Sequence, residues 1–325
     1  MSRPKKKPSS RSSKSDGLHP RNPHGTGYDF ARLTACYPPL GEFVRSTPRG
    51  TDSVDFSDPG AVRALNSALL FAHHRISHWE LPEGYLCPPV PGRDDYLHYL
   101  ADCMAEGGSI PRGRKIRVLD IGTGASIIYP LLGVREYGWS FVGTDIDRVS
   151  LENGSRIIEH NELQRLVELR LQADPREIFT GVFHPGDIFD AVVCNPPFFA
   201  SAQEADRETA RKLRNLHGSE GLPDSESAPV RNFGGRGAEL WCEGGERQFL
   251  QEMINQSADL SLKCLWFTSL VSKKETLSTC YNRLRSLGVH EVKTIQMSQG
   301  QKVSRVLAWS FFTPDQRLLW RKLRW

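Results

Sequence analysis

The residues with the clearest potential for chemistry are Asn195, Pro196, Pro197 and Phe198, which directly follow an apolar run at 188–195. The two prolines stiffen a short loop. The amide oxygen of Asn195 and the carbonyl of Pro196 can both accept hydrogen bonds from a planar NH2 group, and Phe198 can stack on the ring that carries this group. A neutral amine held in this way needs no strong base to attack a cationic carbon, so placement and electrostatics would supply most of the rate.

A second candidate site lies where an acid precedes a glycine turn, at Asp120, Gly122 and Gly124. Glycine allows the backbone to approach a ligand closely. Residue 127 is isoleucine, so the third glycine of the dinucleotide-binding pattern is missing. This argues against a dinucleotide, whose pyrophosphate binds at the start of the following helix. Asp120 can instead hold an ammonium group through water, as the methionine part of a cofactor would require. A plain strand-to-helix turn is the alternative.

A third candidate is Asp145, which ends the next apolar run at 140–145. An acid at this position can accept hydrogen bonds from both ribose hydroxyls of a bound nucleoside. Asp147 is a nearby rival, and either acid could simply cap the helix that follows. We predict that Asp145 is the ribose ligand.

Apolar runs alternate with helical patterns over residues 114–315, which predicts an α/β domain with a mostly parallel sheet. The predicted strands, seven in number, lie at 117–122, 140–145, 167–171, 188–195, 265–270, 292–297 and 306–312. The predicted helices lie at 126–137, 147–161, 245–260 and 272–287. The last two strands are expected to form a hairpin at the edge of the sheet, with residues 298–305 between them.

Three other regions flank or interrupt this domain. Residues 28–113 are predicted to form an N-terminal helical extension packed on the domain, with a helix start at Asp58-Pro59. Residues 200–238 are rich in charge, Gly, Ser and Pro, and a long segment of this kind is predicted to be a flexible insertion. Residues 316–325 form a basic C-terminal end.

The N-terminal residues 1–27 are predicted to be a disordered basic tail. The first 24 residues carry a net charge of +6, and the other 301 carry −2. A basic arm suits a polyanion or an import receptor, although a tail that only improves solubility is the alternative. The run PKKKP at 4–8 is compatible with nuclear import.

The seven cysteines include no CxxC pair. This pattern indicates a reducing compartment and argues against a disulfide framework or a zinc site, so no metal is predicted. No apolar run approaches the length of a membrane span, and the N-terminus has no apolar segment of the secretory type. The sequence therefore indicates no membrane association.

Several segments together resemble the methyltransferase-like 16 family: DIGTGASIIYPLLG (120–133), CNPPFFA (194–200), EGGE (243–246), SQG (298–300) and LAWSF (307–311). The likeness runs in order from Tyr28 to Phe312. It implies a Rossmann-like class I methyltransferase fold, S-adenosylmethionine as the cofactor and an RNA-binding role for the extension at 28–113. The implied reaction is methylation of the exocyclic N6 of an adenine in structured RNA.

The resemblance also assigns residues to the cofactor and to catalysis. Catalysis falls on Asn195 to Phe198, and Arg93 would hold the methionine carboxylate with its forked guanidinium. From the residues alone, Arg93 would be an ordinary surface arginine. Glu243 and Gly244 match a segment beside the active site and receive no chemical step. The full set of predicted cofactor-binding residues is Arg93, Asp120, Gly122, Gly124, Asp145 and Asn195.

Members of the resembled family methylate U6 small nuclear RNA, and their bacterial relatives act on 23S ribosomal RNA. The expected partner is therefore a U6-type hairpin with an ACAGAGA box, and the expected location is the nucleus. A 23S-type target and the cytoplasm are the alternatives, and LWCEGGE at 240–246 is closer to the bacterial relatives. The sequence names no protein partner. The loop at 301–305 departs from the family, which carries two arginines after QG.

Two further alternatives belong to other functional classes. A protein glutamine N5-methyltransferase would use the same loop, because the loop can hold any planar NH2 group, although such enzymes more often have Tyr after the prolines. A non-catalytic RNA-binding protein is the other. Candidate RNA contacts are the basic residues of the tail, the insertion and the C-terminal end: Arg3 to Arg21, Arg207, Arg211, Lys212, Arg214, Arg231, Arg236, Arg317, Arg321, Lys322 and Arg324.

Overall fold

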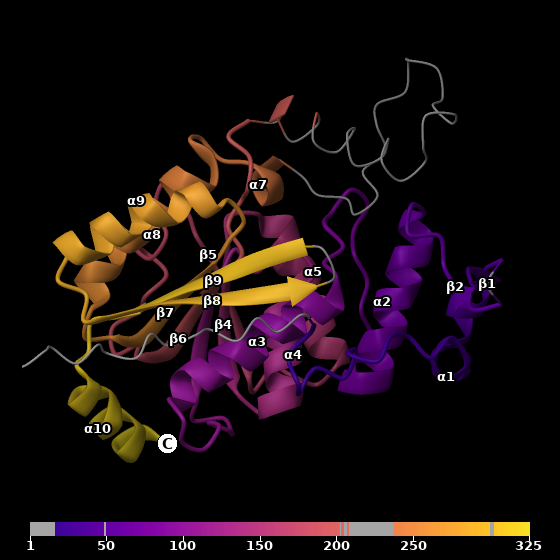
Figure 1. The fold of residues 1–325 in the computed structure, drawn as a ribbon, viewed down its shortest axis with the longest axis horizontal. Helices are drawn as coiled ribbons and strands as arrows, with labels where there is room; N and C mark the ends of the chain where they lie inside the picture. Colours follow the sequence, from indigo (N-terminus) through magenta and orange to yellow (C-terminus); the bar gives the residue numbers. More distant parts are fainter. Residues whose placement is uncertain (1–16, 49, 202, 205–206, 208–236, 300–301) are drawn as a thin grey trace, which may run out of the picture.

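The computed structural model describes residues 17–48, 50–201, 203–204, 207, 237–299 and 302–325 (Figure 1). At its centre lies a seven-stranded sheet with the order β5-β4-β3-β6-β7-β9-β8. The strands are β3 (Arg117–Ile121), β4 (Ser140–Asp145), β5 (Val167–Leu171), β6 (Phe189–Cys194), β7 (Cys264–Val271), β8 (Glu291–Gln299) and β9 (Lys302–Ser310). The first five run parallel, so the prediction of a mostly parallel seven-stranded α/β fold is confirmed.

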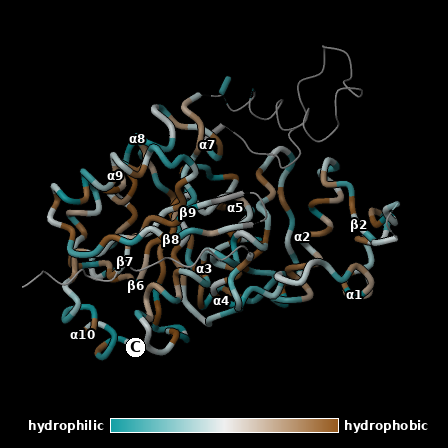
Figure 2. The backbone as a smooth tube through the Cα atoms, viewed as in Figure 1, coloured by the Kyte–Doolittle hydropathy of each residue, from teal (hydrophilic) through white to brown (hydrophobic). Residues whose placement is uncertain are grey.

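The middle strands read as continuous apolar runs because both of their faces are covered. Every residue of β6 and β7 is buried, and these strands are among the most hydrophobic parts of the chain (Figure 2). On one face, α4 (Ile128–Tyr137) and α5 (Arg148–His160) share a core with the N-terminal helices. On the other face, the core contains α8 (Gly245–Ser257) and α9 (Lys274–Ser286). A short 3-10 turn, Ala258–Leu260, follows α8.

The C-terminal hairpin closes one edge of the sheet. β9 pairs antiparallel with β7, and β8 pairs antiparallel with β9 at the outer position. The predicted hairpin is present, but its strands are longer than predicted. Ser298 pairs with Val303 and Gln296 with Arg305. Most of the loop expected at 298–305 is therefore strand, and Gln301 lies outside the described residues.

The N-terminal part is helical, as the sequence predicts, and it shares one core with the sheet. It contains α1 (Phe30–Cys36), a 3-10 turn (Pro38–Glu42), α2 (Pro59–His74) and α3 (Val90–Ala105). A two-stranded ribbon of β1 (Arg45–Ser46) and β2 (Asp52–Ser53) lies between α1 and α2. The Asp58 side chain caps α2 by accepting from Gly60 N, which agrees with the predicted helix start.

Residues 17–27 pack against these helices, with His19, Asn22 and His24 buried. Residues 17–27, which the sequence analysis assigned to the disordered tail, are therefore part of the packed structure. Arg21 contacts Asp102 and Tyr137. The tail residues 1–16 lie outside the described part of the chain, as do most of the insertion and its basic residues Arg211, Lys212, Arg214, Arg231 and Arg236. In the parts that are described, no helix is long and apolar enough to cross a membrane.

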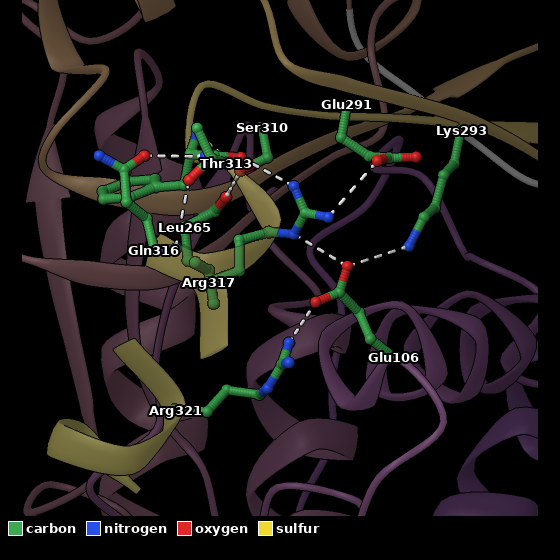
Figure 3. Close-up of polar contacts among 10 residues, drawn as sticks. Glu106, Leu265, Glu291, Lys293, Ser310, Thr313, Gln316, Arg317 and Arg321 are labelled. Carbon is green, nitrogen blue, oxygen red and sulfur yellow. Dashed lines mark hydrogen bonds and ion pairs between the residues drawn. The ribbon is translucent and has the colours of Figure 1, made fainter. Parts of the chain in front are cut away.

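The basic C-terminal end forms a docked helix, α10 (Pro314–Arg324), which begins with a capping box between Thr313 and Gln316. Figure 3 shows how it is held. Arg317 is 3% exposed; its Nε donates to Glu106 at 2.8 Å and its Nη2 to Glu291 at 3.4 Å. Arg321 also pairs with Glu106. Arg317 and Arg321, like Arg21, were candidate RNA contacts and are used inside the fold, and Arg324 lies 3.6 Å from Asp190. Lys322 stays exposed.

The same helix reaches the central strand β6 through two tryptophans. The indole nitrogens of Trp320 and Trp325 donate to one carboxylate oxygen of Asp190 at 2.7 and 2.8 Å. The other oxygen accepts from Arg117 N at 2.8 Å. Asp190 is completely buried, so these donors satisfy a group that would otherwise be costly to bury.

Arg317→Ala is expected to lower the free energy of unfolding by about 2–3 kcal/mol, because it removes the buried donor that joins Glu106 to Glu291, although Glu106 keeps Arg321. Urea unfolding followed by circular dichroism measures the effect. Lys322→Ala is the matched control on the same helix, and its effect should stay within about 0.5 kcal/mol. Equal effects of the two variants would contradict a docking role for Arg317.

Candidate functional site

The carboxyl ends of β3, β4 and β6 open into a cavity of about 710 Å³. In open α/β sheets this edge is the usual place for a ligand. Six predicted residues line the cavity, from four different parts of the chain: Arg93, Gly122, Gly124, Asp145, Asn195 and Pro197. The sheet thus brings together side chains that are up to about a hundred positions apart in the sequence.

Asp120 is the penultimate residue of β3, just before the residues that line this cavity, and it is completely buried. Among the residues that the structure describes, neither of its carboxylate oxygens has a hydrogen-bond partner, nor does the Thr123 hydroxyl. Burial, together with the nearby charge of Asp145, raises the pKa of Asp120 to about 7. An unpaired buried acid is rare in a folded protein unless a ligand or water completes it.

The glycine turn and Asp145 form one rigid unit. Gly122 and Gly124 have φ values of +68° and +65°, a conformation that glycine adopts without strain. The Asp145 carboxylate accepts from Gly124 N at 2.8 Å and from Asp147 N at 2.9 Å. Burial raises the pKa of Asp145. Each carboxylate oxygen keeps capacity for a further donor.

Asp147, the rival of Asp145, has a structural task. It caps α5 by accepting from Val149 N at 3.1 Å. It also accepts from the hydroxyl of Tyr85 at 2.6 Å. The capping alternative raised from the sequence therefore applies to Asp147, although its side chain also borders the cavity.

Arg93 lies in the first turn of α3 and faces the cavity. Its Nη1 donates to the hydroxyl of Tyr129 at 2.9 Å, and its Nε has no partner among the described residues. The guanidinium therefore keeps a free donor beside the cavity, unlike an ordinary surface arginine. Tyr129, which fixes Arg93, is a site residue that the sequence analysis missed.

The loop after β6 is tied to a distant segment. The backbone nitrogens of Phe198 and Phe199 donate to Leu240 O at 3.1 and 3.0 Å. Leu240 is the last residue of α7 (Gly237–Leu240). Asn195 and Pro197 line the cavity, whereas Pro196 is buried and Phe198 is half-buried beside it. The amide oxygen of Asn195 is buried without a partner in the described chain.

The segment after α7 adds Trp241 and Glu243 to the cavity wall. It is held close to the loop because Gly245 has no side chain. A Cβ at Gly245 would lie 3.1–3.3 Å from the backbone of Phe199 and Ala200, and its φ is +62°. Neither Trp241 nor Tyr129 was predicted, since a single aromatic residue carries no motif.

Glu246 fixes this segment to the start of α9. It is buried and accepts from Ser272 N at 2.7 Å, Lys273 N at 3.1 Å and the Thr276 hydroxyl at 3.0 Å. The Ser272 hydroxyl donates to it as well. A carboxylate is well suited to the free amides of a helix start.

Glu246→Ala is expected to cost about 2–3 kcal/mol of folding stability, because several buried donors lose their acceptor. Thermal unfolding would measure this loss. Glu275→Ala removes an exposed acid from the first turn of α9, the helix whose start Glu246 contacts. This change should cost only a few tenths of a kcal/mol. If both variants unfold at the same temperature as the parent chain, Glu246 does not anchor the segment.

The sheet order, its covering helices and the cavity at its carboxyl edge define a Rossmann-like methyltransferase of the class that uses S-adenosylmethionine. The chain belongs to a family described as RNA methyltransferase, whose sequence profile matches residues 12–313.

Curated relatives agree with this membership. The chain is 53% identical over 324 residues to "Ribosomal RNA large subunit methyltransferase F" of Shewanella loihica, covering 94% of this chain and 81% of the relative. It is 52% identical over 320 residues to the protein of the same name from Shewanella frigidimarina, with 95% and 89% covered.

Solved structures agree as well. The human METTL16 catalytic domain in complex with MAT2A 3'UTR hairpin 1 is similar, with a TM-score of 0.76 and 32% identity over 92% of this chain and 96% of that one. The N-terminal domain of human METTL16 in complex with SAH has a TM-score of 0.71 and 29% identity, with 91% and 99% covered.

These comparisons confirm the resemblance to the family and its bacterial relatives, and the chain is an S-adenosylmethionine-dependent RNA methyltransferase. They correct the expected location. The curated relatives at about 50% identity come from bacteria, which have no nucleus, so the nuclear prediction is wrong and the cytoplasmic alternative is favoured. Nothing in them supports a U6-type target, a protein glutamine substrate or a non-catalytic role.

Proposed function

We propose that this chain methylates the N6 of an adenine in 23S-type ribosomal RNA. The observation that carries the proposal is the Asn195 amide oxygen at the cavity edge of β6, which is buried and has no partner among the residues that the structure describes. An acceptor of this kind matches the exocyclic NH2 of adenine. The name of the bacterial relatives, large subunit ribosomal RNA methyltransferase, supports the choice of RNA.

The cavity residues fit S-adenosylmethionine, which supplies a methyl group on a positively charged sulfur. Asp145, held rigid by two backbone donors, would accept the ribose hydroxyls. Asp120, buried without a partner in the described structure, would balance the positive charge of the ammonium group on the methionine part of the cofactor. Arg93 would bind the methionine carboxylate of the cofactor with the guanidinium donors that do not contact Tyr129. Gly122 and Gly124 allow the backbone to come close.

The target adenine must leave its stack to reach this cavity. Asn195 and the carbonyl of Pro196 would accept the two N6 hydrogens, and Phe198 would stack against the base. This arrangement points the nitrogen lone pair along the line of attack. No general base is needed, because the amine proton becomes acidic only after transfer and can leave to water.

The helical part at 28–113 would bind the RNA around the target. Arg32, Arg45, Arg63 and Arg75 are exposed there, and phosphate contacts of this kind raise affinity without reading sequence. Arg63→Glu combined with Arg75→Glu is expected to weaken RNA binding about tenfold or more and to reduce its salt dependence. Filter binding at several salt concentrations measures both. Unchanged binding would place the RNA on another face.

The decisive experiment is methyl transfer from labelled S-adenosylmethionine to a 23S-type ribosomal fragment and to a U6-type hairpin, followed by nucleoside analysis. N6-methyladenosine in the ribosomal fragment alone is the expected result. Label in the hairpin alone would overturn the choice of RNA but keep the chemistry. A labelled product other than N6-methyladenosine would overturn the role proposed for Asn195.

A further inference from the structure

A second cluster of reactive side chains lies away from the cofactor cavity, between residues 17–27 and the helices α2 and α3. His24, His74 and Asp94 meet there, with side chains only 1%, 2% and 1% exposed. The Nε2 atoms of the two histidines lie 3.1 and 3.0 Å from the same carboxylate oxygen of Asp94. The three candidate donor atoms all lie within 4.8 Å of one another.

We propose that His24, His74 and Asp94 bind a zinc ion. Two imidazole nitrogens and one carboxylate oxygen form a donor set that zinc accepts. At zinc–ligand distances of about 2.0–2.1 Å, the donor atoms of a tetrahedral site lie about 3.3 Å apart. The two measured separations from Asp94 are within a few tenths of an ångström of this value, so small side-chain movements would admit the ion.

The site would join three segments that are far apart in the sequence. His24 comes from the N-terminal segment, His74 is the last residue of α2, and Asp94 lies in the first turn of α3. Asp94 directly follows Arg93, which lines the cofactor cavity. A zinc ion here would be structural: it would fasten residues 17–27 to the helices and hold the backbone on which Arg93 stands.

The test is zinc binding to the full chain after chelator treatment, measured by calorimetry with zinc chloride and by the shift in unfolding temperature. One zinc per chain and a raised unfolding temperature are expected for the parent protein. His74→Ala and Asp94→Asn should bind at least tenfold more weakly. Asp94→Asn keeps a hydrogen-bond acceptor at this position, so the variant is expected to fold. Circular dichroism and binding of S-adenosylhomocysteine verify that it does.

His160→Ala is the matched control, because it removes an exposed histidine that stacks on His78 elsewhere. This variant should bind zinc like the parent. The proposal is overturned if the folded parent binds no zinc, or if Asp94→Asn and His74→Ala bind it as tightly as the parent does. The assay contains no RNA and no methyl transfer, so its outcome is independent of the proposed function.

Discussion

Replacing Asn195 by alanine is expected to lower the rate of methyl transfer to RNA by about 10²–10³-fold, the loss typical of removing one well-placed polar group from an active site. The basis for this expectation is the amide oxygen of Asn195 at the cavity, which has no partner in the described part of the chain. Affinity for S-adenosylhomocysteine should fall much less than the rate, because Asn195 is only one of the predicted cofactor-binding residues and the variant keeps Asp145, Asp120 and Arg93. Single-turnover methylation and calorimetry would measure the two quantities.

The matched control is Asn282→Ala, which removes an exposed amide from α9. It should leave both rate and affinity at the level of the parent chain. If Asn195→Ala retained full activity, the amide would not orient the target nitrogen. If the variant lost cofactor affinity and stability together, Asn195 would be acting on the fold and not on the reaction.

The second large effect is expected from Asp120→Asn, which should make the protein without cofactor more stable at pH 8. The pKa of Asp120 is about 7 in the fold and about 3.9 in an unfolded chain. A raised pKa means that this group's contribution to stability is complete below about pH 4 and is lost as the pH rises through about 7. Removing the charge should therefore add about 2–4 kcal/mol at pH 8 and little at pH 4.

The same variant should bind S-adenosylmethionine about ten- to a hundredfold more weakly at pH 8, since an ion pair with the ammonium group is lost. In the parent chain, affinity should fall as the pH drops below about 7, because Asp120 becomes protonated. Asp120→Asn should lose this pH dependence. Thermal unfolding across pH 4–8.5 would test the change in stability, and calorimetry across pH 5–8.5 would test the three expectations for binding.

Asp190→Asn is the control for burial alone. Asp190 is as buried as Asp120, but its oxygens accept from Arg117, Trp320 and Trp325. Asp190→Asn should therefore be less stable than the parent chain at pH 8, whereas Asp120→Asn should be more stable. If Asp120→Asn were destabilised to the same extent, Asp120 would be a structural acid and the proposed ammonium site would be wrong.

The sheet could be predicted because its strands are buried on both faces and so read as apolar runs. The helix α10 could not be predicted in the same way. Its residues are largely polar, and it docks through Arg317 and Glu106, which lie 211 positions apart. A basic segment with no apolar run resembles a solvated end until its distant partners are known.

The candidate site also contains some residues that the sequence predicts and others that only the packing of the chain reveals. Asp120 and Asp145 lie at the carboxyl ends of β3 and β4, and Gly122 directly follows β3, so the topology of the sheet brings them to one edge. Arg93 could be placed only through a family resemblance, since its position depends on the packing of α3 and on Tyr129. The cluster of His24, His74 and Asp94 carries no spacing motif at all, because three separate segments build it. The prediction of no metal rested on cysteine spacing, which does not detect such a cluster.

The anchoring of α10 on β6 also bears on how the chain folds as it is synthesised. Asp190 lies 130 and 135 positions before the two tryptophans that donate to it. Until the ribosome has released α10, a nascent chain that already pairs β3 with β6 lacks the two indole donors that complete Asp190. Asp190 is the second residue of β6, so we expect α10 to complete, late in translation, the edge of the sheet that lies opposite the cofactor cavity.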